Sequence, residues 1–211
     1  MKRIVCYGDS NTWGYDGVSC QRFSEEERWT GLLQELLGTE YKIIEEGLNS
    51  RTTVFEDPLA PGKNGLLYLT PMVCSQLPFD LLILMLGTND LKRMYHVGSF
   101  EVAEGIGRLL RTFQNVMLEK AGSVGKVLLL SPIAIEPAAN GEYMYGFDEH
   151  SKEEAGTLGA ALEQVAEAFG CEFADMAKVT APGKADGIHL DKDGHRAVAE
   201  FLAKRIKSME L

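Results

Sequence analysis

Five short apolar runs are spaced along the chain, and segments with apolar residues every three or four positions separate them. Apolar runs without polar alternation are typical of parallel strands buried on both faces. The predicted strands are Arg3–Tyr7, Tyr41–Glu45, Leu81–Leu86, Lys126–Leu130 and Cys171–Ala174. The predicted helices are Glu26–Leu37, Phe100–Ala121, Glu153–Phe169 and, approximately, Asp191–Met209. This alternation predicts an α/β fold: a three-layer αβα sandwich with a five-stranded parallel sheet and helices on both faces.

Three segments show no clear periodicity and include several proline, glycine and asparagine residues: 14–25, 56–65 and 133–151. Right-handed crossovers place the carboxyl ends of all the strands at one edge of the sheet. Loops at such an edge usually form the walls of a site. No internal repeat, low-complexity tract or linker interrupts the pattern, so residues 1–211 are predicted to form a single domain.

Composition restricts the classes of partner. The apolar share of 45% and the charged share of 25% are those of an ordinary globular protein. The net charge of −10 argues against nucleic acid or an anionic membrane as a partner, because both attract basic patches. No apolar run approaches membrane-spanning length. The four cysteines form no CxxC pair and lie far apart, which predicts a reduced, cytoplasmic protein.

A serine follows the first predicted strand directly. The strand ends in Gly8-Asp9-Ser10, which places Ser10 at the sheet edge where ligands bind in open α/β folds. A serine hydroxyl in this position is a candidate nucleophile, provided that a base lies within hydrogen-bonding reach. The alternative is that the turn merely caps the next helix.

The best candidate for the base is His189. Asp186 precedes it by three residues in a tight turn, so the carboxylate can fold back onto one ring nitrogen and leave the other to accept the serine proton. The alternative is an ordinary turn followed by a surface histidine. Of the remaining histidines, His195 is expected to be structural. His96 and His150 are expected in loops that line the site, where they could contact substrate, but neither has a carboxylate at a comparable spacing.

Ester hydrolysis also needs donors for the oxyanion of the tetrahedral intermediate. Asn89 follows the third predicted strand, and its side-chain amide could point towards Ser10; alternatively, Asn89 or Asp90 caps the next segment. The backbone N–H of Ser10 is a second candidate donor. A third could come from the loop after the second strand, Gly47-Leu48-Asn49-Ser50.

Two other classes of function compete with a serine hydrolase. A metal-dependent phosphoesterase could use a set of carboxylates and histidines: Asp9, Asp90, Asp186, His189 and His195. However, no HxH, HExxH, GxxxxGK[ST] or GxGxxG pattern is present, so we expect no metal and no other cofactor. The second alternative is a non-catalytic binder of acylated small molecules, against which the intact pair of Asp186 and His189 argues.

Together, these blocks resemble the SGNH (GDSL-type) hydrolase superfamily. Gly8-Asp9-Ser10 matches its first block, Gly87-Thr88-Asn89-Asp90 its third and Asp186-Gly187-Ile188-His189 its last, in order along nearly the whole chain. A closer resemblance, to the bacterial arylesterase/acyltransferase branch, is carried by three longer segments: Gly8–Tyr15, Arg28–Gly31 and Glu45–Thr53.

The resemblance implies a flavodoxin-like sheet with the SGNH hydrolase fold, a triad of Ser10, His189 and Asp186, and no cofactor. Members hydrolyse small esters, some transfer acyl groups to alcohols, and some are homo-oligomers. We therefore expect a serine esterase that acts on small, short-acyl carboxylic esters (aryl or acetyl esters, or acetylated sugars) through an acyl-enzyme on Ser10. Acyltransferase activity would use the same acyl-enzyme.

The chain departs from the superfamily in the second block, which normally presents a glycine whose N–H enters the oxyanion hole. The alignment places Ser50 there, with Gly47 three residues earlier as the alternative. A backbone donor requires glycine only where φ is positive. The expected oxyanion donors are therefore Ser10, Ser50 and Asn89.

The substrate pocket is predicted from sequence neighbours of the catalytic groups. Asn11, Trp13 and Ile188 are expected to wall it, and an aromatic side chain so close would favour short acyl groups; alternatively, Trp13 packs under its loop. Arg51 is expected to anchor its loop through a buried ion pair, the alternative being a contact with a substrate carboxylate. Two aromatic loop segments could cover the pocket or form contacts between copies: 94–96 and 143–147.

Overall fold

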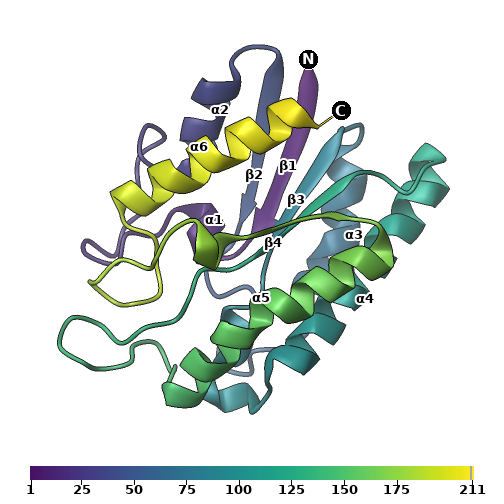
Figure 1. Ribbon diagram of the computed structural model, residues 1–211. Helices are drawn as coiled ribbons and strands as arrows, with labels where there is room; N and C mark the ends of the chain where they lie inside the picture. The colour runs from purple at the N-terminus through teal and green to yellow at the C-terminus, as the bar shows by residue number, and fades with distance from the viewer. Residues whose placement is uncertain (210) are drawn as a thin grey trace.

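The sheet has five parallel strands in the order β2-β1-β3-β4-β5 (Figure 1). This computed structural model describes residues 1–209 and 211. The strands are β1 (Lys2–Gly8), β2 (Tyr41–Gly47), β3 (Leu81–Met85), β4 (Val127–Ser131) and β5 (Glu172–Asp175). The predicted α/β fold with five parallel strands is confirmed. Gly8 pairs with Gly47 on one side and Met85 on the other, so the loops after these three strands start at one level.

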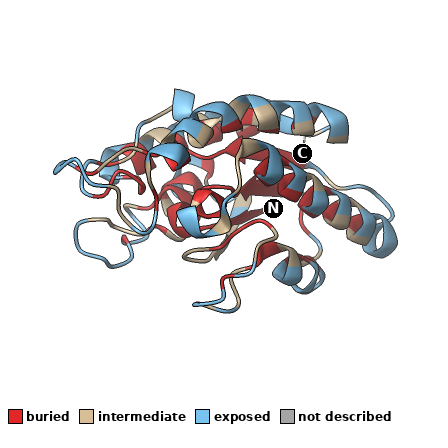
Figure 2. Cartoon of the chain, turned by 90° about the horizontal axis from the view of Figure 1, so that it is seen from below, coloured by how far each residue is buried: buried red, intermediate tan, exposed pale blue. Residues whose placement is uncertain are grey.

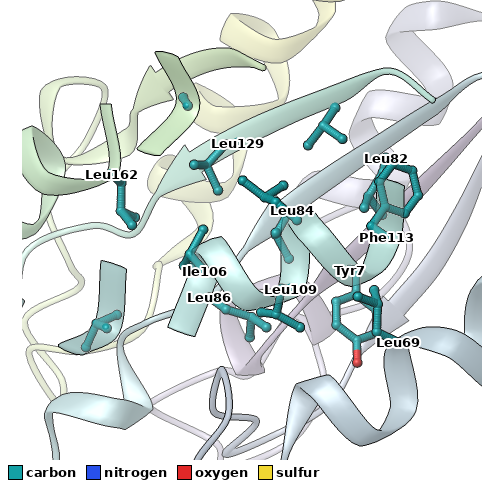
Figure 3. Close-up of a cluster of buried hydrophobic side chains, with 14 of the residues drawn as sticks. Tyr7, Leu69, Leu82, Leu84, Leu86, Ile106, Leu109, Phe113, Leu129 and Leu162 are labelled. Carbon is teal, nitrogen blue, oxygen red and sulfur yellow. The ribbon is translucent and has the colours of Figure 1, made fainter. Parts of the chain in front are cut away.

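Helices cover both faces of the sheet (Figure 1). On one face lie α2 (Trp29–Leu37) and α6 (Lys192–Ser208); on the other lie α3 (Gly65–Gln76), α4 (Ser99–Ala121) and α5 (Glu149–Phe169). Alternate strand residues face opposite layers, as the pleat requires: Ile4 packs with α2 and α6, whereas Val5 packs with α3, α4 and α5. Figure 3 shows the buried cluster between the sheet and helices α3, α4 and α5. Figure 2 shows that the outer faces of the helices are exposed.

The observed helices differ from the sequence prediction in several places: the short helix α1 (Ser10–Trp13) was not predicted, and α2 starts three residues after the predicted start. Helix α3 was not predicted, because Pro71 lies inside it and its apolar residues do not keep to one face: Leu67 is exposed, whereas Leu69 is buried. Helix α5 starts at Glu149, four residues before the predicted start. The Asp148 side chain accepts from Ser151 N and the Ser151 hydroxyl accepts from Asp148 N, which forms a capping box.

The start of α2 is fixed to its neighbours. The Arg28 guanidinium binds Glu45 of β2 through two bonds of 2.6 and 2.8 Å. His195 of α6 accepts from Trp29 N at 3.1 Å and so satisfies a free amide of the first turn. His195 is fully buried, and burial lowers its pKa to about 4, as expected for a structural histidine. None of the described helices has the length and apolar character needed to cross a bilayer.

Candidate active site

Ser10 begins the short helix α1 (Ser10–Trp13), which follows β1 without a connecting loop. The Asp9 carboxylate accepts from Asn11 N at 3.0 Å and caps this helix. Gly8 permits the sharp turn, because a Cβ at this position would lie 2.0 Å from Oγ1 of Thr12. The local sequence therefore presents the Ser10 hydroxyl at the carboxyl edge of the sheet.

Ser10, His189 and Asp186 form one hydrogen-bonded chain. Nε2 of His189 lies 2.9 Å from Oγ of Ser10, and Nδ1 of His189 lies 2.6 Å from Oδ2 of Asp186. A proton on Nδ1 satisfies the carboxylate, so Nε2 is the atom that accepts from the serine hydroxyl. All three side chains are buried; Asp186, at 2% exposure, is the most enclosed.

The turn that carries Asp186 and His189 is held by the carboxylate itself. Oδ1 of Asp186 accepts from the backbone N–H groups of Ile188 and His189, both at 3.0 Å. Burial alone would raise the pKa of Asp186, but the hydrogen bond and charge of His189 and these two backbone donors outweigh burial and lower it. Gly187 has φ +73°, and a Cβ there would lie 1.9 Å from the Glu136 carbonyl oxygen, so the turn needs glycine.

A pocket of about 330 Å³ opens onto Ser10 and His189. Its lining comes from several loops: Ser10, Tyr15, Asn49, Ser50, Asn89, Lys92, Tyr145, Phe147, Ile188 and His189. The rings of Tyr15 and Tyr145 flank the imidazole, with centroids 4.4 and 5.6 Å from that of His189. The pocket is therefore small and partly aromatic.

Two of the three predicted pocket residues lie outside this lining. The Asn11 side chain is occupied by the backbone around His189: it donates to Ile188 O at 3.2 Å and accepts from Leu190 N at 2.9 Å. Trp13 is neither core nor pocket wall, because the Arg22 guanidinium lies over its half-buried ring at 5.3 Å. Ile188 does line the pocket.

The predicted oxyanion donors all line this pocket. Asn89 lies in the 3₁₀ turn η1 (Asn89–Leu91), and its Nδ2 donates one proton to Arg51 O at 3.2 Å, which leaves the second proton available. Ser50 has φ +63°, a left-handed conformation that favours glycine, the residue that the superfamily normally has at this position.

Gly47 lies outside the pocket lining, and packing explains why it is glycine. A Cβ at Gly47 would lie 2.3 Å from Trp13 N, so a side chain there would push α1 away from β2. Of the two candidates in the second block, Ser50 is the one that faces the pocket.

Arg51 anchors its loop, but not through the ion pair that we expected. Its buried guanidinium donates to the backbone carbonyls of Gly8 (2.8 Å) and Glu46 and lies 4.1 Å from the centroid of the Tyr7 ring. Asp90 holds the other side of the loop by accepting from the backbone N–H of Thr53 at 2.9 Å and from its hydroxyl at 2.5 Å. Burial raises the pKa of Asp90 to about 7.

The other aspartates and histidines considered as metal ligands or bases do not gather at one site. Within the described chain, no group of three or more histidine, cysteine, aspartate or glutamate side chains could hold a metal ion. Asp9, Asp90 and His195 each bind backbone groups instead. His96 and His150 are exposed and do not line the pocket.

Sequence reasoning did not identify Tyr15 and Lys92 as pocket residues. Tyr15 stands in the segment that carries the resemblance, Gly8–Tyr15, and Lys92 follows Asn89 by three residues. Their closeness in sequence to Ser10 and Asn89 could have suggested that they line the pocket, but closeness in sequence does not specify the direction of a side chain.

Comparisons with known proteins agree with this geometry. The model of the GDSL-like lipase/acylhydrolase family matches residues 6–197. An aryl esterase of M. smegmatis is 32% identical over 100% of both chains, with a TM-score of 0.93. Est24, a carbohydrate acetylesterase from Sinorhizobium meliloti, is 32% identical over 99% of both chains, with a TM-score of 0.92. Another carbohydrate acetylesterase family member from Sinorhizobium meliloti is 33% identical over 98% of both chains, with a TM-score of 0.89. A sequence search of curated proteins finds no match.

Proposed function

Since this chain belongs to the GDSL-like lipase/acylhydrolase family, we propose that it hydrolyses small, short-acyl carboxylic esters through an acyl-enzyme on Ser10. The observation that carries this proposal is the hydrogen-bonded chain from the Ser10 hydroxyl through His189 to the buried Asp186. A serine hydroxyl is a weak nucleophile until such a base removes its proton.

In this mechanism, His189 Nε2 takes the proton as Ser10 Oγ attacks the ester carbonyl. The carboxylate of Asp186 keeps the other proton on Nδ1 and stabilises the imidazolium that forms. His189 then protonates the leaving alcohol, and the acyl group remains on Ser10. Water attacks this acyl-enzyme with His189 again as base, which releases the acid and restores the serine. An alcohol in place of water would give acyl transfer.

The oxyanion of each tetrahedral intermediate would be stabilised by the backbone N–H groups of Ser10 and Ser50 and by the Asn89 amide. The bond from Asn89 to Arg51 O supports this assignment, because it orients the amide before substrate arrives. Loss of one such donor raises the barrier by about 3–4 kcal/mol in comparable sites.

The preference for small esters rests on the size of the pocket, about 330 Å³, and on its aromatic walls. The related aryl esterase and carbohydrate acetylesterases support aryl and acetyl esters as substrates, including acetylated sugars. A series of 4-nitrophenyl esters from acetate to octanoate should show kcat/KM falling as the acyl chain lengthens.

An organophosphonate provides the direct test. It should form one adduct on Ser10, located by mass spectrometry of the digested protein, and block hydrolysis of phenyl acetate. Ser10→Ala should form no adduct and lose at least about 10⁴-fold in kcat with the fold intact by circular dichroism. A parent protein that neither reacts nor turns over would indicate a non-catalytic binder, and EDTA-sensitive cleavage of a phosphate ester would indicate a metal-dependent phosphoesterase.

The location and the partners stay predictions. A cytoplasmic location is supported by the four cysteines, all of which are free, and cell fractionation would test it. The net charge of −10 supports a small-molecule substrate rather than nucleic acid or a membrane. A homo-oligomer is proposed from the family resemblance, and light scattering would test it.

A further inference from the structure

Lys92 introduces an amine into the pocket wall. It follows the η1 turn that carries Asn89 and lines the same pocket as Ser10 and His189. Its side chain is half-buried, and Nζ lies 5.8 Å from the centroid of the Phe147 ring, which also lines the pocket. The wall beside the nucleophile therefore combines an aromatic face with an ammonium group.

The ammonium of Lys92 has no direct anionic partner among the described residues. In the described part of the chain, no carboxylate lies within ion-pair distance of Nζ and no oxygen accepts a hydrogen bond from it. Lysines that do form ion pairs lie at the surface, such as Lys152 with Glu136 and Lys192 with Glu27. Within residues 1–209 and 211, the protein thus keeps a partly desolvated amine without a direct ion-pair partner in the pocket wall beside Ser10.

The reduced solvation of the Lys92 ammonium favours the binding of an anion at this point. Burial lowers the pKa of Lys92, while the more distant carboxylates of Asp57, Asp9 and Asp90 act in the opposite direction. A charged amine with reduced solvation and no close counter-ion gains more from an incoming anion than a fully hydrated amine would. The net charge of −10 would otherwise repel such a molecule.

Arg51, another cation near this edge, is not available for this role. Its guanidinium is buried and occupied by the carbonyls of Gly8 and Glu46, and it lies outside the pocket lining. Lys92 is therefore the group in this wall that is suited to bind an acidic part of the substrate.

We propose that the substrate of this pocket is a small ester that carries a free carboxylate, and that Lys92 binds this carboxylate while the ester carbonyl lies at Ser10. This inference rests on the proposed ester hydrolysis and narrows its substrate class. A pocket of about 330 Å³ accommodates a short acyl group and one small acidic moiety. Lys92 acts as a specificity-determining residue.

The kinetic test compares three esters. Phenyl acetate is neutral, 4-acetoxybenzoate carries the carboxylate in its alcohol part, and monophenyl succinate carries it in its acyl part. The quantity measured is the ratio of kcat/KM for each charged ester to that for phenyl acetate. In Lys92→Met, the ratio for at least one charged ester should fall about 10- to 100-fold, and Lys92→Arg should restore most of it.

The charged ester that responds identifies the side of the ester bond that Lys92 contacts. Lys178→Met removes an equal charge from an exposed lysine outside this pocket and should leave the ratios unchanged. Ratios that are the same in the parent and in Lys92→Met for both charged esters would overturn the proposal.

A binding measurement separates this inference from the ester hydrolysis itself. Calorimetry with 4-hydroxybenzoate and with succinate uses the Ser10→Ala background and needs no turnover. Binding of either acid that weakens about 10-fold or more on adding Lys92→Met supports the anion site, even if no ester is cleaved. Equal binding in both variants, or no binding of either acid, would overturn the proposed anion site. The esterase mechanism is tested separately by the organophosphonate experiment.

Discussion

The Asn11 side chain holds the backbone on both sides of His189. Its amide donates to Ile188 O at 3.2 Å and accepts from Leu190 N at 2.9 Å, across separations of 177 and 179 residues. Asn11 directly follows Ser10 in helix α1. One short helix therefore carries both the nucleophilic hydroxyl and the side chain that holds the backbone of the base, His189. The distance between the two reacting groups thus depends on a side chain that does not line the pocket.

Removal of the Asn11 side chain should impair catalysis more than substrate binding. In Asn11→Ala, the Ile188 carbonyl and the Leu190 N–H lose their partner, and the free energy of unfolding should fall by about 1–3 kcal/mol. We expect kcat for phenyl acetate to fall about 10- to 100-fold, with a smaller change in KM, because a displaced base loses its alignment. Steady-state kinetics on protein shown to be folded would check this. A stability loss with kcat unchanged would show that Asn11 is only structural.

Asp186→Asn should nearly abolish turnover, because an amide stabilises the wrong tautomer of His189 and does not stabilise the imidazolium. The expected loss of kcat is about 10⁴-fold. Since the folded state lowers the pKa of Asp186, its carboxylate stabilises the fold above its ordinary pKa of 3.8. This stability should disappear as pH falls below 3.8 through the folded-state pKa.

Urea unfolding of the parent and Asp186→Asn at pH 6, 5, 4 and 3 measures that contribution. The difference in unfolding free energy between the two proteins should be constant near neutrality and shrink at the acid end. A difference independent of pH down to 3 would contradict the ionised, hydrogen-bonded carboxylate.

Ser50→Gly should stabilise the protein without removing the oxyanion donor. Serine at φ +63° carries backbone strain that glycine does not, so we expect about 0.5–1 kcal/mol of added stability. Most of kcat should be retained, because the proposed donor is the backbone N–H. By contrast, Asn89→Ala removes a side-chain donor and should lower kcat about 10²–10³-fold. A comparable loss in Ser50→Gly would assign the role to the serine hydroxyl instead.

The buried His195 should make the fold sensitive to mild acid. Its folded-state pKa of about 4 lies below the ordinary 6.5, so between these values the unfolded chain binds a proton that the folded chain does not. Stability should therefore fall as pH drops from 6.5 towards 4, by up to roughly 3 kcal/mol, and then level off. His195→Asn keeps an acceptor for Trp29 N but does not titrate, so it should lack this slope. Denaturant titrations of both proteins at pH 7, 5.5 and 4.5 measure this. If the unfolding free energy fell equally with pH in the parent and in His195→Asn, His195 would not be the group responsible.

Local sequence patterns were enough for much of the fold and for the reacting groups. Unbroken apolar runs indicate buried strands. The three-residue spacing of Asp186 and His189 lets the carboxylate of the first reach the imidazole of the second. The same reasoning did not find α3, because Pro71 and apolar residues on several faces obscure its period. Ser10 was identified from its place at the end of a strand, a property that adjacent residues specify.

The pocket and its supports depend on contacts between distant segments, which no local pattern encodes. The register of Gly8 with Gly47 and Met85 aligns three loops at one edge. Only the packing of those loops turns Asn11 towards the base, occupies Arg51 with carbonyl groups and leaves Lys92 in the wall. Side-chain periodicity specifies which face of an element is buried, whereas the direction of a loop side chain depends on which neighbours fill the space around it.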